Sequence, residues 1–453
     1  MSHDQRLRLL AASPNDPRAT AALTALDDVH VVIDPGAEMA SVHVPALIAL
    51  AALLARLVGR VSIARPVAAP PNWWGVGSVG EIVDVVEGLR AALPARLPSR
   101  TLRVTFGAEG VAPADLGVGG GDLIAGVGLS PVVLDPAVHA LGVHAAACLA
   151  VGQVLNRVLG GLGYPGVVLD EPYALDLITH RPIHGARAEA PRLSLPSPPA
   201  RPLDIAVAGV GSVGTSTLAL LAMSVGGRRG GRPAPAELHV TAIDGDRLDP
   251  RRNPFRYPAL RGGEQGNKAD WIVGRLREFG IAADAASCGV GKWAMTRPQP
   301  GFDGLLVSSV DTVPARLDVA DVLARETLSV GVSGLALHAQ RERFADGLCC
   351  PFCDYVSADP PATQAQVYAT LTGLSVARVL QLLDGDASLT AADLEAVAAT
   401  GRVPDHRRAE LVGFRLADLV REAYAEAPLR TGAPDSGTVA GQVPRRGVSR
   451  ATA

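Results

Sequence analysis

Residues 203–217 read LDIAVAGVGSVGTST, and this stretch decides the fold. The apolar run after Asp204 is typical of a buried strand in a parallel sheet. Gly209, Gly211 and Gly214 follow it at the spacing GxGxxG, directly before a run that predicts a helix. In such a unit the first glycine permits a tight turn, the second lets a phosphate approach the backbone, and the third lets helix and strand pack closely. The stretch predicts a nucleotide-binding α/β domain, with a merely glycine-rich turn as the alternative.

The sequence downstream of this stretch continues as alternating strands and helices, which predicts a mainly parallel sheet. We expect strands at 203–209, 238–243, 303–309 and 328–332, and helices at 213–225, 266–279, 314–326 and 364–383. A tail at 430–453 lacks apolar periodicity and is predicted to be disordered.

The first part of the chain predicts a second α/β domain at 1–189, separated by a proline-rich linker at 190–202 from the domain at 203–429. Its expected strands are 29–34, 60–64, 101–106 and 121–128, and its expected helices are 44–59, 79–93 and 138–160. Residues 144–161 resemble residues 368–385, so this domain is either a degenerate copy of the other or unrelated to it. Gly36 follows its first strand, but no GxGxxG does.

Composition excludes several classes of protein. The chain has 453 residues and a net charge of −3, which argues against a nucleic-acid binder that relies on neutralising phosphates. The most apolar run contains Arg56 and Arg60, so we expect a buried helix and a strand there and no membrane span. Five cysteines do not make a disulfide framework, which predicts a reduced, cytoplasmic protein. Trp73 and Trp74 are expected to anchor a buried loop.

Polar residues after the strand at 238–243 indicate which nucleotide is bound. Asp244 ends that strand, where an acid can hold ribose hydroxyls in either NAD or ATP. Arg256 and Lys268 could neutralise phosphate oxygens, and a carboxylate such as Asp311 at a strand's carboxyl end can hold Mg²⁺. Taken singly these residues are ordinary surface charges or helix caps; together with Asn253 they favour ATP over the NAD of a dehydrogenase.

This set of residues resembles the ThiF/MoeB superfamily of ubiquitin-activating-like enzymes, which adenylate the C-terminal carboxylate of a small protein or peptide. The resemblance covers about residues 203–385 and implies a Rossmann-like adenylation domain. The family pattern is a GxGxxG loop, an Asp-x-Asp strand end, an Asn-x-x-Arg turn, a lysine, and an aspartate followed five residues later by arginine. The matching positions after the glycine loop are Asp244, Asp246, Asn253, Arg256, Lys268, Asp311 and Arg316.

The resemblance implies a role for each position. Asp244 would bind the ribose hydroxyls, with Asp246 close by. Asn253, Arg256 and Lys268 would contact the triphosphate. Asp311 would coordinate Mg²⁺, with Thr312 beside it. Arg256, Lys268 and Asp311 would therefore carry the catalytic charge stabilisation.

The cysteines depart from the family pattern. Cys350 and Cys353 match the first half of the family's structural zinc site, but no second Cys-x-x-Cys follows. Cys349 and His406 could complete a zinc site; otherwise the pair are small buried thiols. Cys288 is expected in the core. A thioester-forming cysteine is therefore expected to be absent, unless Cys349 serves.

The sequence thus predicts an ATP-dependent adenylyltransferase that acts on a carrier protein or peptide with a free carboxyl terminus. It is expected to work as a homodimer or as an internal pseudo-dimer. Two alternatives remain open: an inactive scaffold of the same fold, and an NAD-dependent oxidoreductase. The sequence does not identify the acyl substrate, nor does it decide whether a thioester or sulfur transfer follows.

Overall fold

The computed structural model describes residues 17–36, 39–89, 97–107, 114–129, 132–134, 141–164, 166–169, 171–183, 203–225, 238–249, 253, 264–298, 301–333, 336–343, 364–383, 387–400, 412–413 and 416. These residues fall into two compact units. The first unit contains two α/β sheets, and the second contains the helices that follow Cys349. The predicted linker at 190–202 and tail at 430–453 lie outside the described residues, so the predicted domain boundaries stay predictions.

The first sheet is mixed, with strand order β2-β1-β3-β4-β5-β6-β7. Strands β1 to β4 are parallel, and β5, β6 and β7 each run antiparallel to the preceding strand. The strands are β1 Val29–Pro35, β2 Arg60–Ile63, β3 Arg100–Phe106, β4 Leu116–Gly120, β5 Ile124–Gly128, β6 Tyr173–Asp176 and β7 Arg181–Ile183.

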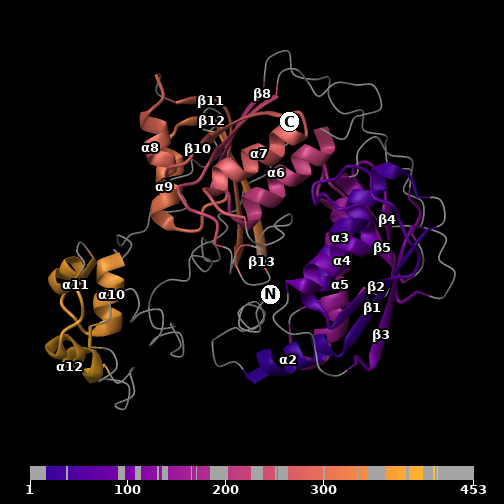
Figure 1. Ribbon diagram of the computed structural model, residues 1–453, viewed down its shortest axis with the longest axis horizontal. Coiled ribbons are helices and arrows are strands. Elements are labelled where there is room, and N and C mark those ends of the chain that lie inside the picture. The colour runs from indigo at the N-terminus through magenta and orange to yellow at the C-terminus, as the bar shows by residue number, and fades with distance from the viewer. Residues whose placement is uncertain are drawn as a thin grey trace, which may run out of the picture. The chain divides into compact units, whose positions relative to one another are not determined.

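Apolar helices cover this sheet and form its core. The helices are α2 Pro17–Asp27, α3 Val44–Leu57, α4 Val79–Gly88 and α5 Leu141–Leu159, with short 3-10 turns at Ser41–His43 and Gly160–Leu162. α3 packs against α4 and α5, and α5 packs against β4 and β5 (Figure 1). Leu47, Leu50 and Leu54 of α3 are fully buried, as is Ile33 of β1.

One helix in the described part of the chain, Leu141–Leu162, is long and apolar enough to span a bilayer by length and composition alone. It includes α5, whose buried side chains face β4, β5 and α3. Its packing is that of a core helix in an α/β layer.

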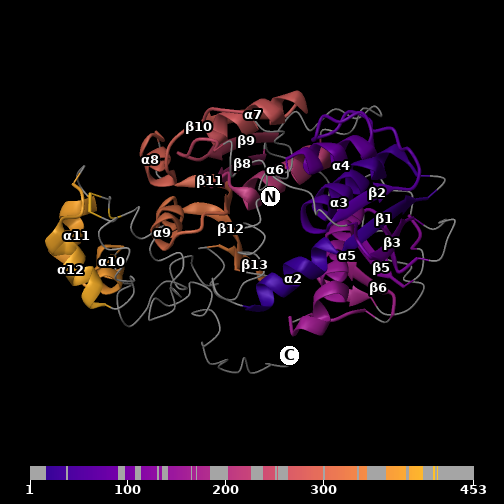
Figure 2. The same ribbon diagram turned by 60° about the horizontal axis from the view of Figure 1, so that its bottom comes forward.

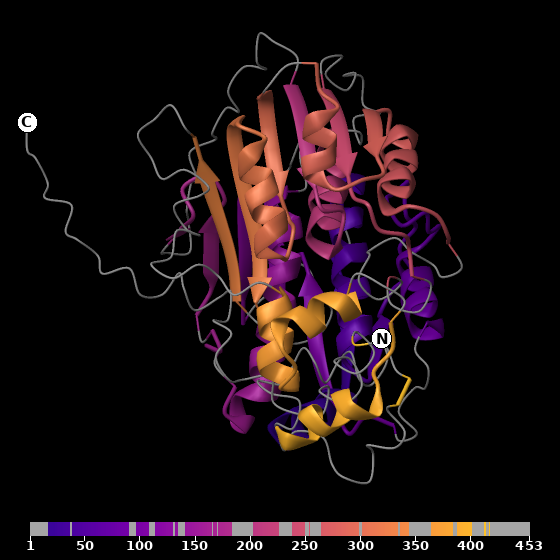
Figure 3. The same ribbon diagram turned by 90° about the vertical axis from the view of Figure 1, so that its left-hand side faces the viewer.

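The second sheet is mainly parallel and has strand order β10-β9-β8-β11-β12-β13, with only β13 antiparallel among the described strands. Helices α6 and α7 lie on the face toward the first sheet's helices, and α8 and α9 lie on the other face (Figures 2 and 3). The strands are β8 Leu203–Ala208, β9 Leu238–Ile243, β10 Ala282–Ala286, β11 Phe302–Ser308, β12 Ala324–Ser333 and β13 Ala336–Glu342; the helices are α6 Ser212–Val225, α7 Lys268–Glu278, α8 Val290–Met295 and α9 Val313–Asp321. The α/β fold class predicted for this half, including its mainly parallel sheet, is confirmed.

Two predicted helices were wrong in extent. The helix expected at 314–326 ends at Asp321, because Leu323 adopts a left-handed φ of 52° and β12 begins to pair with β11 at Ala324. The helix expected at 364–383 is two helices, α10 Gln364–Thr372 and α11 Val376–Leu383. Gly373, at φ 72°, ends the first of them and donates its N–H to Ala369 O at 2.8 Å.

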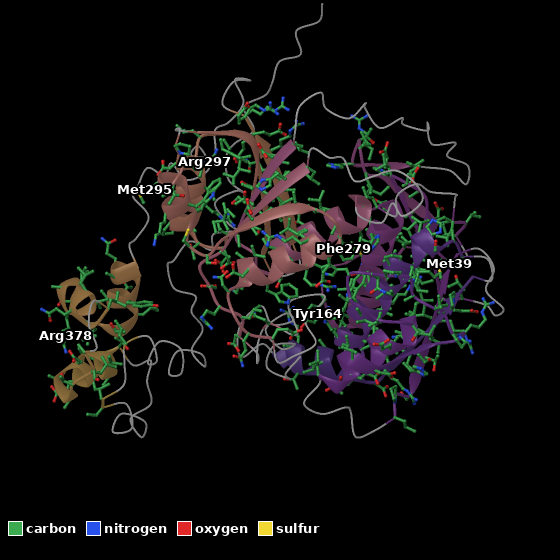
Figure 4. All side chains as sticks on the ribbon, turned by 45° about the horizontal axis from the view of Figure 1, so that its top comes forward. Met39, Tyr164, Phe279, Met295, Arg297 and Arg378 are labelled. Atoms are coloured by element: carbon green, nitrogen blue, oxygen red, sulfur yellow. The ribbon has the colours of Figure 1, made fainter. Side chains whose placement is uncertain are left out.

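The loop that carries Trp73 and Trp74 belongs to the first half of the chain and contacts α7 of the second half. Trp73 is fully buried and Trp74 nearly so, which confirms the predicted anchor. Arg275 of α7 donates a hydrogen bond to Trp73 O, and its guanidinium lies 5.5 Å from the centre of the Trp73 ring. Phe279 lies just after α7 (Figure 4). The centre of its ring is 5.5 Å from the centre of the Trp73 ring. The end of α7 is therefore held by the first half of the chain.

The second unit contains α10, α11 and α12 Ala391–Ala399, which share a small apolar core. Asp393 of α12 is a buried charged residue of this unit. Arg378 of α11 donates to both carboxylate oxygens, at 2.9 and 2.8 Å, and Thr390 caps α12 by exchanging hydrogen bonds with Asp393. The hydrogen bonds from Arg378 hold the pKa of Asp393 well below its usual range.

Asp393→Asn is expected to lower the free energy of unfolding of this unit by about 1.5–3 kcal/mol, the worth of hydrogen bonds to a charged group. Because the native pKa is depressed, the wild type's advantage is fully present above the ordinary aspartate pKa of about 3.9 and shrinks as the pH falls below it. Urea melts of both proteins followed by circular dichroism between pH 3 and 7 measure this, with the exposed neighbour Glu395→Gln as the matched control. A pH-independent difference would contradict the assignment.

Candidate functional site

The candidate site lies at the carboxyl ends of β8, β9 and β11, where the strand order reverses direction. The chain passes from β8 to β9 on one side and later returns to β11 on the other side of β8. In open α/β sheets, ligands bind in the crevice at such a reversal.

The glycine loop between β8 and α6 gives each glycine a separate role. Gly209 adopts a left-handed φ of 84°. A Cβ at Gly214 would lie 2.1 Å from Gly209 O and 2.7 Å from Ser309 Oγ, so only glycine lets α6 approach this closely. A Cβ at Gly211 would meet nothing within 4 Å. The open space beside Gly211 is where the sequence predicts that a phosphate approaches.

The first amides of α6 are available to an anion. Thr215 N–H donates to Gly211 O at 2.9 Å, which closes the first turn. Among the described residues, no hydrogen bond engages the N–H groups of Ser212, Val213 and Gly214. Unpaired amides at a helix N-terminus attract phosphate through both their hydrogens and the helix dipole.

Asp244 faces the glycine loop from the end of β9. Its Oδ2 accepts the N–H of Val210 at 2.7 Å, and its Oδ1 accepts the N–H of Asp246 at 2.8 Å. Each carboxylate oxygen has two lone pairs, so one on each remains for a ribose hydroxyl. Burial raises the pKa of Asp244, against the opposing effects of these two N–H groups and of Lys268.

The raised pKa of Asp244 predicts how stability depends on pH. The native state keeps this proton to a higher pH than the unfolded chain does, so the wild type loses stability as the pH rises from about 4 through the raised native pKa. Asp244→Asn does not ionise and should gain on the wild type over that interval. Free energies of unfolding from urea melts between pH 4 and 7 test this, and a constant difference would contradict it.

Lys268 begins α7 and lies beside Asp246. Its Nζ is 2.6 Å from Asp246 Oδ2, and its backbone N–H donates to Asp246 O at 3.0 Å. The Lys268 side chain is 14% exposed and that of Asp246 is 75% exposed. The lysine side chain is thus mostly buried, its ammonium contacts a carboxylate that faces solvent, and an incoming phosphate would compete for this ammonium.

Asp311 and Thr312 follow β11. Ser309 ties this segment to the glycine loop, since its N–H donates to Ala208 O at 2.9 Å and its hydroxyl donates to Gly209 O. Asp311 is exposed, which suits a carboxylate that shares Mg²⁺ with a phosphate. Thr312 Oγ1 accepts Ala315 N–H at 3.4 Å and caps α9. Arg316 Nε donates to Val310 O at 3.2 Å, so this arginine supports the loop backbone.

The structure brings the glycine loop, Asp244, Asp246 and Lys268 together, but it does not place every predicted residue in the site. Asn253 is buried, and its Oδ1 accepts the N–H of Asp249, which makes it a support of the loop after β9. Arg256, Cys349, Cys350, Cys353 and His406 lie outside the described residues, so the phosphate contact of Arg256 and the zinc site stay predictions.

Within the described ranges, no group of three or more His, Cys, Asp or Glu side chains is arranged to hold a metal ion. A bound triphosphate would supply phosphate oxygens as ligands to Mg²⁺ at Asp311. Cys288, after β10, packs against the apolar cluster under α8, as expected of a core cysteine.

Sequence reasoning missed two residues that shape the site, Ser309 and Asn267. Asn267 caps α7 and also donates its Nδ2 to Asp244 O at 2.9 Å. An asparagine directly before a helical run signals a cap. The bond to Asp244 has no sequence signal, because it depends on how the segment before α7 pairs with the segment after β9.

Comparisons with known proteins give a partial likeness in fold. Neither a protein-family model nor a curated protein matches the chain. Among similar solved structures, E. coli MccB with SeMet MccA has 17% identity and a TM-score of 0.23, and the match covers 29% of this chain and 37% of MccB. E. coli MccB with MccA-N7isoASN has 14% identity and a TM-score of 0.27, over 39% of this chain and 52% of MccB. The chain thus spans about half of MccB or less, and a likeness of this size concerns the fold alone.

Proposed function

We propose that the chain uses ATP to adenylate the C-terminal carboxylate of a carrier protein or of a ribosomally made peptide. One observation carries the proposal: the Lys268 ammonium, 2.6 Å from Asp246, lies at the same sheet edge as the glycine loop and Asp244. A dinucleotide oxidoreductase uses the loop and the acid, but it transfers hydride far from the phosphates and has no need of an ammonium there. A triphosphate, with its larger negative charge, does need one.

The proposed reaction needs no protein nucleophile. A carboxylate oxygen of the substrate attacks the α-phosphorus, the bond from that phosphorus to the bridging oxygen breaks, and pyrophosphate leaves with the electron pair. The amides of Ser212 and Val213 would hold phosphate oxygens, Asp244 would fix the ribose, and Lys268 would neutralise charge on the leaving group. Mg²⁺, held by Asp311 together with the triphosphate, would supply further charge neutralisation.

We propose further that the first sheet is a degenerate copy of the second, which would make the chain an internal pseudo-dimer. The order β2-β1-β3-β4-β5 repeats the order β9-β8-β11-β12-β13, and in each case only the last strand is antiparallel. In the first sheet α3 connects β1 to its neighbour β2, and in the second sheet α6 connects β8 to its neighbour β9. Among the described residues, the first sheet has no counterpart of β10, α8 or α9.

The first sheet's carboxyl edge supports this proposal because an arginine occupies the end of β1, where the second sheet has the glycine loop after β8. Arg65 donates to Asp34 Oδ1 at 3.2 Å and to Pro35 O, at the end of β1. Gly36 N–H donates to Phe106 O at 2.8 Å. Because Asp34 is already paired with Arg65, we do not expect it to bind the ribose of a nucleotide. This half would instead serve as a support or as a docking surface for the substrate.

Exchange of labelled pyrophosphate into ATP tests the adenylation step. Carrier proteins and peptides with a free carboxyl terminus should support exchange, and the same peptides with a C-terminal amide should not. Asp311→Ala should reduce exchange to background. Mg-ATP binding without exchange for any free carboxylate would instead favour a nucleotide-binding scaffold without turnover.

A further inference from the structure

We propose that Asn267 is a positioning residue of the nucleotide site, one that fixes the Lys268 ammonium relative to Asp244. This inference rests on the proposed ATP-dependent function, because it assigns how the cation is aimed at the triphosphate. Asn267 would not touch the nucleotide itself. It acts through the helix that carries Lys268 and through the backbone of the residue that faces the glycine loop.

Asn267 uses both ends of its side-chain amide. Its Oδ1 accepts Ala269 N–H at 2.7 Å and Asp270 N–H at 3.4 Å, which caps α7. Its Nδ2 donates to Asp244 O at 2.9 Å. A serine or an aspartate could supply the cap, but the aspartate carboxylate has no donor, and serine has only the one short hydroxyl that makes the cap. Asparagine alone among good caps joins the start of α7 to the end of β9 in this way.

The segment before α7 is held close to the segment after β9. Arg247 and Asn267 form an antiparallel bridge, and Leu248 N–H donates to Gly266 O at 2.8 Å. Lys268 N–H, in turn, donates to Asp246 O at 3.0 Å. The backbone on both sides of Asn267 is therefore held by hydrogen bonds. The Asn267 side chain adds a further link, between the residue before Lys268 and the backbone of Asp244.

The same contacts close the N-terminus of α7 to anions. The N–H groups of Lys268, Ala269 and Asp270 are occupied by Asp246 and by Asn267. Any phosphate contact from the start of this helix must therefore come from the Lys268 side chain. At the other end, Arg275 and Phe279 hold α7 against Trp73, so the helix does not shift freely to restore a misplaced lysine.

The test uses the full chain and compares Asn267→Ser with the wild type. Serine caps a helix about as well as asparagine, so the melting temperature should stay within about 4 °C. The dissociation constant of Mg-ATP, measured by calorimetric titration, should rise about tenfold, because the ammonium is no longer held in place. AMP, which lacks the phosphates that Lys268 would meet, should bind within about twofold of wild type, since twofold is only a few tenths of a kcal/mol.

A double-mutant cycle with Lys268→Gln separates positioning from a general loss of structure. In the Lys268→Gln background, Asn267→Ser should leave Mg-ATP affinity unchanged. Equal losses for ATP and AMP, or losses that add, would overturn the positioning role while leaving the function intact. Failure of the wild type to bind Mg-ATP would overturn the proposed function, and this inference with it.

Discussion

Gly214→Ala is expected to lower the free energy of unfolding of the two-sheet unit by about 3 kcal/mol or more, at the upper end of the cost of overpacking. The added methyl would lie 2.1 Å from the backbone oxygen of Gly209 and 2.7 Å from Ser309 Oγ. A backbone oxygen inside a buried turn moves only if β8 or α6 moves. The change should therefore separate α6 from the loop and abolish nucleotide binding as well.

Gly211→Ala is the matched control, because its methyl would meet nothing within 4 Å and its φ lies outside the left-handed region. Its stability should stay within about 0.5 kcal/mol of wild type. Its affinity for Mg-ATP should fall, since the methyl would occupy the space that a phosphate needs. Urea melts and ligand titration of the two variants check both expectations. Equal stability losses would contradict the roles assigned to the two glycines.

Lys268→Gln is expected to raise the dissociation constant of Mg-ATP roughly 10- to 100-fold, which corresponds to the loss of a charged hydrogen bond. The lysine is 14% exposed and would exchange its contact with Asp246 for a phosphate. AMP should be affected far less, because its one phosphate would be held by the α6 amides.

The sequence supplies its own control, since Lys292 is the only other lysine of the 453 residues. Lys292 lies exposed on α8, and Lys292→Gln should leave both affinities unchanged. Calorimetric titration of Mg-ATP and AMP against the two variants measures the effect. A similar loss in both variants would mean that only the general charge of the protein matters.

The parts of the fold that could be predicted from sequence are those whose signal is local. The central strands are apolar and β-branched, so β9 was expected at 238–243 and lies at Leu238–Ile243. The spacing of the glycines is also a local signal, and it predicted the turn after β8. The peripheral strands carry no such signal: β10 reads AADAA and β13 reads ALHAQRE. They are strands because β9 and β12 offer them backbone partners, which composition does not reveal.

In the site, too, local signals could be predicted from sequence and tertiary contacts could not. Asp244 was predicted from its place at a strand end, and Lys268 from its place after the turn. Their partners depend on tertiary pairing: Asp246 for the lysine, and Asn267 for the backbone of Asp244. The phosphate contact of Asn253 stays a prediction, while the hydrogen bond that its Oδ1 accepts from Asp249 N–H has no signal in the motif. A motif shows which residues occur together, and only the fold shows which of them face outward.

Thermal stabilisation of the wild type and Asp311→Ala by Mg-ATP and by NAD tests the central claim most directly. A ligand that binds only the native state adds about 2.7 kcal/mol of stability at 100 times its dissociation constant. We expect Mg-ATP to raise the melting temperature of the wild type, Asp311→Ala to show a smaller rise, and NAD to have no effect on either. Stabilisation by NAD alone, or no response to Mg-ATP, would contradict an ATP site at this sheet edge.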